Sequence, residues 1–411
     1  MTAAVATPNT SEPAADTEQG ERPEVSVLIV NYRSGAMTRG LIEHLRTQRL
    51  AGREPGEGLE FIVLDNASGG NEEAHLTALE ADGVSVIRAG QNSGYAVGVN
   101  LAAERARGRF VLVSNPDVMI FRGALRNMVE YLQANPECGQ VGPKSFLDAG
   151  RFFWLPPCDL PSLCELKSET FARLFKFWGK RHAAARTRRA LKHWTMTSPT
   201  PATQLSGHCF MMPAPLAREL GPFDTAYPLY YEDADLCLRL HRKGFSTMVL
   251  PNVSAVHFFN RSAGPVVGAA MSRYAVSRKL FYRRRYGLLG SWLASLLTSL
   301  GNSGLGKGYQ FARVEDLGEV DEVPEIEVPG TGAYVAEISG DPSFVFAAGR
   351  LDVARRFQVP NDVWKGLAEG GYYLRFLERK TLRVLRTVKL HKVGHSAPVS
   401  AARAARTMVH A

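Results

Sequence analysis

The chain has 411 residues, of which 45% are hydrophobic and 22% charged, a composition typical of a globular protein with more than one domain. Its formal net charge is +9 at pH 7, and basic residues gather at 173–192, at 273–285 and near the C-terminus, which suits an anionic partner such as a membrane surface or a nucleic acid. Five cysteines without a CxxC pair argue against a disulfide framework or a zinc knuckle. No signal peptide or long apolar run is present, so we expect a cytoplasmic protein without a membrane-spanning helix.

The first residues, 1–22, are rich in Ala, Thr, Glu and Pro, and we expect a disordered tail there. Beyond them, short buried strands alternate with helices, which predicts an α/β fold with a mostly parallel sheet flanked by helices. The predicted strands cover 25–30, 59–65, 84–88 and 110–114. The predicted helices are one that carries the apolar residues Leu41, Ile42 and Leu45, one at 71–81 and one at 98–107.

A polar residue follows each of these strands, where the carboxyl ends of parallel strands place a ligand crevice. Gly94 and Gly98 permit close backbone approach to a ligand. No GxGxxG or GxxxxGK[ST] loop follows the first strand, which disfavours a dinucleotide or P-loop site. The polar residues are Asn31, Asp65, Asn92 and Asp117.

Asp117 closes the stretch FVLVSNPD, in which Asn115-Pro116 stops the strand. A carboxylate at the end of a central strand can hold a divalent cation against a diphosphate. The alternative is a carboxylate that only caps a turn.

The segment 152–200 combines aromatic residues with a strongly basic run and forms an insertion. Phe171, Leu174, Phe175 and Trp178 recur at helical spacing. This pattern fits an amphipathic segment lying on a membrane, or a helix that packs on the core and exposes a basic face.

Glu232 and Asp233 begin a predicted amphipathic helix in YYEDADLCLRLHRKGF, 230–245. They could cap the helix through its macrodipole, or one could act as the base that takes a proton from a hydroxyl. His257 ends a later strand; it could be a packed histidine, or together with Asp117 it could offer the oxygen and nitrogen ligands that Mg²⁺ or Mn²⁺ accepts.

We expect four segments in the C-terminal third of the chain. A helical part at 266–310 has three arginines before an apolar run and suits either a membrane-interfacial helix or a buried helix. An acidic linker is expected at 311–331, a small β-rich module at 332–392 and a mobile tail at 393–411. The module's expected strands are AYVAEI, SFVFAA, GYYLRFLER and TLRVLRTVKL.

Seven pieces of the chain, in order, resemble family 2 glycosyltransferases of the GT-A fold, most closely the rhamnosyltransferase-like branch. They are VSVLIVNYRS, FIVLDNAS, QNSGYAVGVN, SNPDV, SGHCFMMP, YYEDADLCLRLHRKGF and VHFFNRS. The resemblance implies a GT-A domain at 23–265 that includes the 152–200 insertion. It does not extend to the 332–392 module.

The resemblance implies a role for each matching position. Asp117 and His257 would hold the metal, Asp233 would be the general base with Glu232 beside it, and Ser206 and Gly207 would shape the acceptor side. Asn115 stands where the family often has the first Asp of Asp-X-Asp, which alters the ribose or sugar contact. The nucleotide-sugar would be bound by Asn31, Tyr32, Asp65, Asn66, Asn92, Gly94 and Asn115.

The resemblance implies an inverting glycosyltransferase of the hexosyltransferase type that takes its sugar from a dTDP- or UDP-linked donor. Rhamnose or another deoxyhexose is the leading candidate for that sugar. The acceptor would be a saccharide or a polyprenyl-linked saccharide in cell-surface polysaccharide synthesis, reached from the inner face of the plasma membrane. A missing QxxRW motif favours a single transfer per visit. The alternatives are a nucleotidyltransferase, a non-catalytic sugar-nucleotide-binding or membrane-associated scaffold, and a nucleic-acid-binding protein, for which no aromatic platform is present.

Overall fold

The computed structural model describes residues 22–258, 267–306, 308–310, 312–330 and 332–394. Nearly all of the tails predicted at 1–22 and 393–411 lie outside these described residues, and so does the end of the VHFFNRS motif. The predicted domain boundaries stay predictions.

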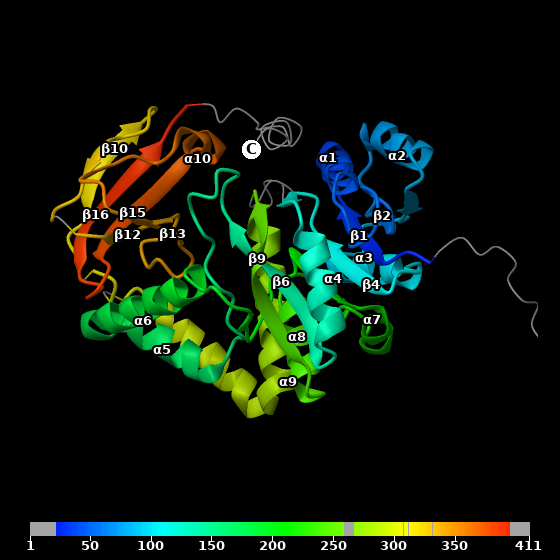
Figure 1. Cartoon of the computed structure of the whole chain (residues 1–411). Coiled ribbons are helices and arrows are strands. Elements are labelled where there is room, and N and C mark those ends of the chain that lie inside the picture. The colour runs from blue at the N-terminus through cyan, green and yellow to red at the C-terminus, as the bar shows by residue number, and fades with distance from the viewer. Residues whose placement is uncertain (1–21, 259–266, 307, 311, 331, 395–411) are drawn as a thin grey trace, which may run out of the picture.

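A nine-stranded sheet forms the centre of the larger part of the molecule, in the order β3-β2-β1-β4-β8-β6-β9-β5 with β7 paired to β9 (Figure 1). Strands β3, β2, β1, β4, β6 and β9 run in one direction, whereas β8, β5 and β7 run against them. The mostly parallel α/β sheet predicted from the sequence is therefore confirmed. Its strands are β1 (Val25–Asn31), β2 (Leu59–Asp65), β3 (Ser85–Arg88), β4 (Phe110–Ser114), β5 (Val118–Ile120), β6 (Cys138–Phe146), β7 (Thr200–Pro201), β8 (Cys209–Pro213) and β9 (Ser246–His257).

Helices cover both faces of this sheet because its central strands are apolar on both sides. One face packs on α1 and α4 in a cluster that includes Leu41, Leu45 and Met128. The other face packs on α3, α7 and α8 through residues such as Val99 and Leu236. The helices are α1 (Gly35–Arg46), α2 (Glu72–Ala81), α3 (Tyr95–Glu104), α4 (Ala124–Ala134), α7 (Ala214–Leu220) and α8 (Glu232–Arg242).

Helix α3 begins three residues before the predicted start at Gly98, and this prediction was wrong in its boundaries. Gly94 stands at its N-cap with φ 87°, a conformation that glycine adopts without strain. Gly98 lies inside the helix, where an added Cβ would come 3.0 Å from the side chain of Val30. The glycine therefore lets α3 pack closely on β1.

The 152–200 insertion folds as two helices, α5 (Leu163–Leu174) and α6 (Lys176–Trp194), separated at Phe175. Phe175, Phe177 and Trp178 are exposed, whereas the middle of α6 is buried under the C-terminal sheet. The following helix, α9 (Val267–Gly301), changes direction at Gly287, where φ is 74°. Within the described residues no helix is long and apolar enough to cross a membrane.

A second sheet lies beside the first, in the order β10-β16-β15-β12-β13 (Figure 1). The segment SFVFAA, predicted as a strand, is mostly a turn because Asp341 Oδ1 accepts from the Ser343 amide at 2.8 Å and Phe344 has φ 55°. Strands also occupy part of the predicted linker at 311–331, since β10 pairs with β16. The elements are β10 (Glu315–Val320), β11 (Ile326–Glu327), β12 (Tyr334–Ser339), β13 (Ala348–Asp352), β14 (Arg356–Phe357), α10 (Asn361–Gly366), β15 (Gly370–Glu378) and β16 (Val384–Lys392).

Trp154 joins the two sheets. It bridges to Phe146 at the end of β6 and to Gly349 in β13, with both Trp154–Gly349 backbone hydrogen bonds at 2.9 Å. Its ring stacks on Trp194 at the end of α6, with ring centroids 6.1 Å apart. A side chain at position 349 would collide with Trp194, so glycine is required there.

Candidate active site

Asn31 and Asp65 end neighbouring parallel strands and pair in register, which brings their side chains together. Asn31 is fully buried, and its Nδ2 donates to Asp65 Oδ1 at 2.8 Å. Ser68 in the turn after β2 donates to the same carboxylate from its amide and its hydroxyl, at 3.1 and 2.5 Å. The first two polar strand ends predicted from the sequence therefore form one buried network.

Asn66 extends this network toward the loop before α3. Its Nδ2 donates to Asn92 Oδ1 at 3.1 Å, and its Oδ1 accepts from the Ser93 amide at 2.9 Å. Asn92 Oδ1 also accepts from the Gly94 amide at 3.1 Å. Tyr32, directly after β1, is half-buried with the Arg33 guanidinium 5.3 Å from its ring centroid. The residues predicted to bind a nucleotide thus lie along one edge of the sheet.

Asp117 and His257 are brought together by the pairing of β5 with β9 in the register Val118↔His257. Asp117 Oδ1 lies 3.4 Å from His257 Nε2, and the Asp117 side chain is buried. The amide of Phe258 donates to the Asp117 carbonyl at 3.0 Å, which fixes the backbone of both residues. A carboxylate oxygen and an imidazole nitrogen therefore face one another at this point.

His208 connects this pair to the rest of the site. Its ring stacks on that of His257, with centroids 4.6 Å apart and planes 5° apart, and its Nε2 lies 2.9 Å from Ser145 Oγ. Burial, and then the neighbouring His257, hold the pKa of His208 well below its usual value, so this imidazole is neutral at physiological pH. The Asn115 amide donates to the His208 carbonyl at 2.8 Å.

Glu232, which is buried, and Asp233, which is half-buried, are neighbouring carboxylates at the start of α8. Asp233 Oδ2 accepts from the Gly207 amide at 3.0 Å, and Oδ1 accepts from the Ala234 amide at 2.7 Å. Burial raises the pKa of Asp233, while these amides and the Gln204 side chain lower it. Burial, and then the charge of Asp233, raise the pKa of Glu232 to about 8. Glu232 Oε2 has no hydrogen-bond partner among the described residues.

Tyr95 shows that the two carboxylate groups belong to one site. Its hydroxyl donates to the Gly207 carbonyl at 2.9 Å, beside the amide that holds Asp233. Burial raises the pKa of Tyr95 well above its usual value, and the charges of Glu232, Asp233 and Asp117 raise it further. Contacts through Gly207, His208 and His257 link the predicted base to the predicted metal ligand.

The loop before α8 carries backbone strain next to the carboxylates. Tyr230 and Tyr231 both have left-handed φ, 63° and 70°, which is rare for bulky residues and costs of order 1–3 kcal/mol each. Tyr231 is buried against Tyr274 and Phe281 of α9. Packing against α9 thus stabilises a conformation that the loop alone would not adopt.

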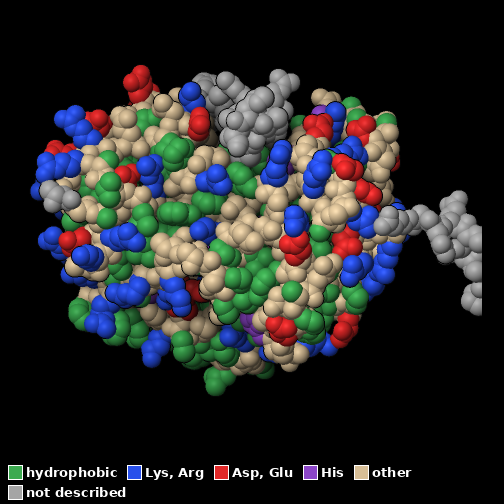
Figure 2. All heavy atoms as spheres, viewed as in Figure 1, with side chains coloured by type: hydrophobic (Ala, Val, Ile, Leu, Met, Phe, Trp, Pro, Cys, Tyr) green, Lys and Arg blue, Asp and Glu red, His purple; other side chains and the backbone are tan. Residues whose placement is uncertain are grey.

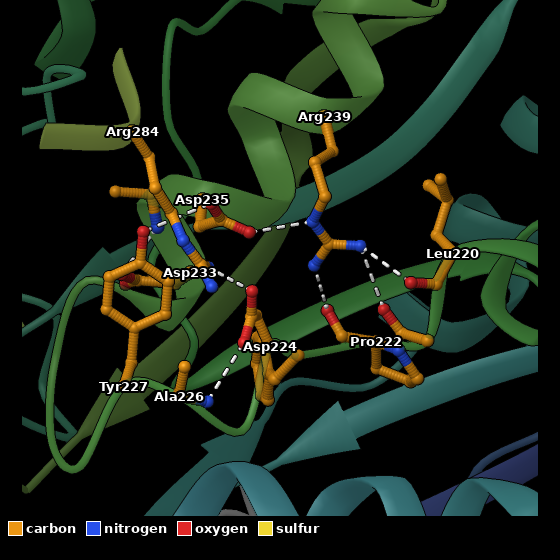
Figure 3. Close-up of polar contacts among 12 residues, drawn as sticks. Leu220, Pro222, Asp224, Ala226, Tyr227, Asp233, Asp235, Arg239 and Arg284 are labelled. Atoms are coloured by element: carbon orange, nitrogen blue, oxygen red, sulfur yellow. Dashed lines mark hydrogen bonds and ion pairs between the residues drawn. The ribbon is translucent and has the colours of Figure 1, made fainter. Parts of the chain in front are cut away.

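Arg239 ties the same loop to α8 (Figure 3). Its Nε donates to Asp235 Oδ2 at 2.7 Å, and its two other nitrogens donate to the carbonyls of Leu220, Gly221 and Pro222 at 2.8–3.2 Å. Asp235 also accepts from the Tyr227 hydroxyl at 3.2 Å. Asp235 is therefore held by the side chains of Arg239 and Tyr227, whereas Asp233, two residues earlier, accepts from backbone amides.

Arg284 of α9 reaches into this cluster, where it pairs with Asp224 and lies 5.3 Å from the ring centroid of Tyr227 (Figure 3). Arg285 donates to the Pro161 carbonyl. Two of the three consecutive arginines thus hold protein groups; Arg283 and Arg284 are exposed, and Arg285 is half-buried. Helix α9 therefore supports the site directly.

Three residues of the site were missed by the sequence reasoning: Tyr95, Gln204 and His208. Each lies beside a residue that was found, in QNSGY or in TQLSGHC, so proximity to a motif was the available signal. Ser206 is half-buried, and Gly207 contributes through its backbone.

No cluster of three or more metal-ligating side chains occurs in the described part of the chain. Asp117 and His257 form a pair, so an ion held there would need further ligands from a substrate or from water.

Residues 26–192 match the family described as glycosyl transferase family 2. The chain is 26% identical over 231 residues, 54% of its length and 73% of the relative's, to N-acetylglucosaminyl-diphospho-decaprenol L-rhamnosyltransferase of Mycobacterium tuberculosis. It is 23% identical over 238 residues, 57% of its length and 67% of the relative's, to low-salt glycan biosynthesis hexosyltransferase Agl10 of Haloferax volcanii.

Among solved structures, the mannosyltransferase PcManGT from Pyrobaculum calidifontis, in complex with GDP-Man and Mn²⁺, aligns with a TM-score of 0.43 at 17% identity. The alignment covers 68% of this chain and 74% of that one. The family match covers the strand ends and carboxylates from Asn31 to Asp117, and the resemblance read from the motifs is confirmed. The match over residues 26–192 and the two named transferases support a glycosyltransferase.

Proposed function

We propose that the protein transfers a sugar, with inversion, from a nucleotide-diphosphate donor to a hydroxyl of a saccharide or polyprenyl-linked saccharide. The observation that carries the proposal is the chain of contacts from Asp117 to Asp233: His257 lies 3.4 Å from Asp117 and stacks on His208, and the amide of the adjacent Gly207 donates to Asp233. Direct displacement at an anomeric carbon requires a metal-binding carboxylate and a proton acceptor in one site, and these contacts support that assignment.

Asp233 is the proposed general base. Two backbone amides orient its carboxylate, and burial raises its pKa toward the range that suits proton transfer near neutral pH. The acceptor hydroxyl gives its proton to Asp233 as its oxygen bonds to the anomeric carbon, and the bond from that carbon to the diphosphate oxygen breaks. Glu232, protonated at neutral pH, keeps a second negative charge away from the base.

The nucleotide part of the donor is proposed to bind along the edge formed by β1, β2 and the loop before α3. Asp65 would accept from the pyrimidine ring, and Asn31 holds that carboxylate in place. Asn66 orders the loop that carries Asn92 and Gly94. Tyr32 and Asn115 would complete the base and sugar contacts. A pyrimidine donor, dTDP- or UDP-linked, fits this assignment.

Asp117 and His257 are proposed to hold a divalent cation, Mg²⁺ or Mn²⁺. The donor set fits, because Asp117 Oδ1 and His257 Nε2 lie 3.4 Å apart and Mg²⁺ is commonly held by one or two protein groups together with substrate phosphates and waters. Such an ion supplies Lewis-acid stabilisation of the diphosphate leaving group. The protein's own part is to fix the two ligands at the ends of β5 and β9.

A deoxyhexose such as rhamnose is the proposed sugar, and a polyprenyl-linked saccharide the proposed acceptor, since one relative is named for rhamnosyl transfer to a decaprenol-linked sugar. A membrane surface on the cytoplasmic side is the proposed location. Support comes from an exposed apolar stripe on α9, which recurs at helical spacing. The stripe consists of Leu288, Leu289, Trp292, Leu293, Leu296 and Leu300.

Thermal-shift measurements with nucleotide diphosphates and nucleotide-sugars, with and without Mn²⁺, test the proposal. A pyrimidine nucleotide with Mn²⁺ should raise Tm by mass action, and Asp65→Asn should abolish the effect. Asp82→Asn, an exposed carboxylate of the loop after α2, is the matched control and should leave the shift unchanged. Equal stabilisation by purine nucleotides would contradict the assignment of Asp65.

A further inference from the structure

Helix α6 and the C-terminal sheet line an open cavity of about 260 Å³, and none of its lining residues belongs to the carboxylate site. Its wall contains five cationic side chains and no acidic one. On the visible face, Lys and Arg side chains are more prominent than Asp and Glu over this part of the molecule (Figure 2). The lining residues with polar or charged side chains are Lys180, Arg313, Arg375, Arg383, Arg386 and Thr387.

A buried row of polar residues crosses the sheet beneath the cavity. Glu337 in β12 pairs with Arg375 in β15, which pairs with Thr387 in β16. Arg375 donates to Glu337 Oε2 at 2.5 Å, and Arg186 of α6 donates to Glu337 Oε1 at 2.5 Å. All three charged side chains are at most 9% exposed. One buried carboxylate thus faces two buried guanidinium groups.

Positive charge in this row exceeds negative charge, which is costly in a buried setting unless an anion compensates it. The Phe344 ring, 4.1 Å from the Arg375 guanidinium carbon, offsets part of the cost. Arg186 Nε and Nη1 have no hydrogen-bond partner among the described residues. Two donors of a buried cation are therefore left without an acceptor.

Thr387, at the cavity wall, is a second observation that points to a bound ligand. It is 5% exposed, and its Oγ1 has no hydrogen-bond partner within the described ranges. Buried hydroxyls are normally hydrogen-bonded, and an unpartnered one calls for an explanation such as an absent ion or water. A hydroxyl and a guanidinium, side by side across two strands, are groups that bind a phosphate oxygen.

The other cationic side chains of the cavity wall differ in whether they already form an ion pair. Arg386 pairs with Glu315 at 2.8 Å, and Arg383 lies 4.0 Å from Glu378. Lys180 and Arg313 have no ion-pair partner among the described residues. The wall therefore keeps two cations available for a ligand.

We infer that this cavity binds a phosphate group, held by Thr387 and Arg375 at the sheet and by Lys180 and Arg313 at the rim. Its volume is below the roughly 300–1,000 Å³ of pockets for drug-sized ligands, which suits a phosphate or diphosphate with its waters. The phosphate could be a free ion or the headgroup of a lipid. The inference does not depend on the proposed transfer reaction.

The test uses the full chain and two probes at constant ionic strength: inorganic pyrophosphate, and short-chain phosphatidic acid kept monomeric. Binding is measured by calorimetry and by Tm. We expect at least one probe to raise Tm by about 2 °C or more at saturation. Thr387→Val and Lys180→Gln should each weaken binding by about fivefold or more, because each removes one phosphate contact.

Lys192→Gln, an exposed lysine of α6 outside the cavity wall, is the control and should leave binding unchanged. Binding of pyrophosphate assigns the site to a free phosphate, and binding of phosphatidic acid alone assigns it to a lipid headgroup. The inference is overturned if neither probe binds, or if Thr387→Val and Lys180→Gln both bind as the wild type does. Circular dichroism of both variants checks that they are folded.

Discussion

Asp117 and His257 meet at the ends of β5 and β9, with 3.4 Å between Oδ1 and Nε2. Asp117 is the turn residue directly before β5, and the pairing of Val118 with His257 sets this separation, so the pair is held in place before any ligand arrives. His208 stacks on His257, which restricts the imidazole further.

Asp117→Asn should weaken Mn²⁺ binding at least about 10- to 100-fold, since even loss of an outer-shell partner has that effect. Transfer should then need correspondingly more Mn²⁺ to reach half its maximal rate. The titration of activity against free Mn²⁺ measures this change. An unchanged titration would remove Asp117 from the metal site, and Asp82→Asn serves as the control.

Tyr95→Phe should lower kcat by about fivefold with little effect on the donor KM. The variant loses the hydrogen bond to the Gly207 carbonyl, worth about 1 kcal/mol, and with it the fixed position of the amide that holds Asp233. Steady-state kinetics with both substrates separates the two constants. Tyr372→Phe removes a similar bond, to the Ala368 carbonyl at 2.9 Å, far from the site and should leave kcat unchanged. A rise in donor KM alone would contradict the positioning role.

Glu232→Gln should change how stability depends on pH. The folded-state pKa of Glu232 is about 8, above its unfolded value, so the folded protein keeps a proton that the unfolded chain releases. Stability is therefore fully present below the unfolded pKa and is lost as pH rises toward 8. The variant lacks this loss, so its Tm relative to wild type should be higher at pH 9 than at pH 5, by roughly 2 °C or more. Glu43→Gln, an exposed control, should show no such difference.

Leu289→Glu should reduce binding to vesicles by about tenfold if the apolar stripe of α9 lies in a membrane interface. A charged group there must leave water, whereas the leucine gains from burial. Co-sedimentation with anionic vesicles measures the change. Val353→Glu is the matched control, because Val353 is 73% exposed and Leu289 75%. Equal binding of both variants would exclude the stripe as the contact.

The sequence predicted the parallel strands and their polar ends well, because apolar runs of five to seven residues closed by Asn or Asp carry both signals locally. It missed Tyr95 and His208, whose roles arise only when α3 and β8 come together. The strand predicted at SFVFAA was wrong, because the side chain of Asp341 forms a turn there that the apolar alternation does not reveal. The polar row Glu337–Arg375–Thr387 depends on the register of β15 with β16 and of β15 with β12, which lies 38 residues earlier in the chain at Glu337.

Asp233→Asn tests the central claim most directly, in a single-turnover assay of sugar transfer with donor affinity measured in parallel. The amide keeps the shape of the side chain but cannot accept the proton, so the rate should fall by about 10²- to 10⁴-fold while the nucleotide-sugar binds as before. Transfer at the wild-type rate by a folded variant would contradict the assignment of Asp233 as the base.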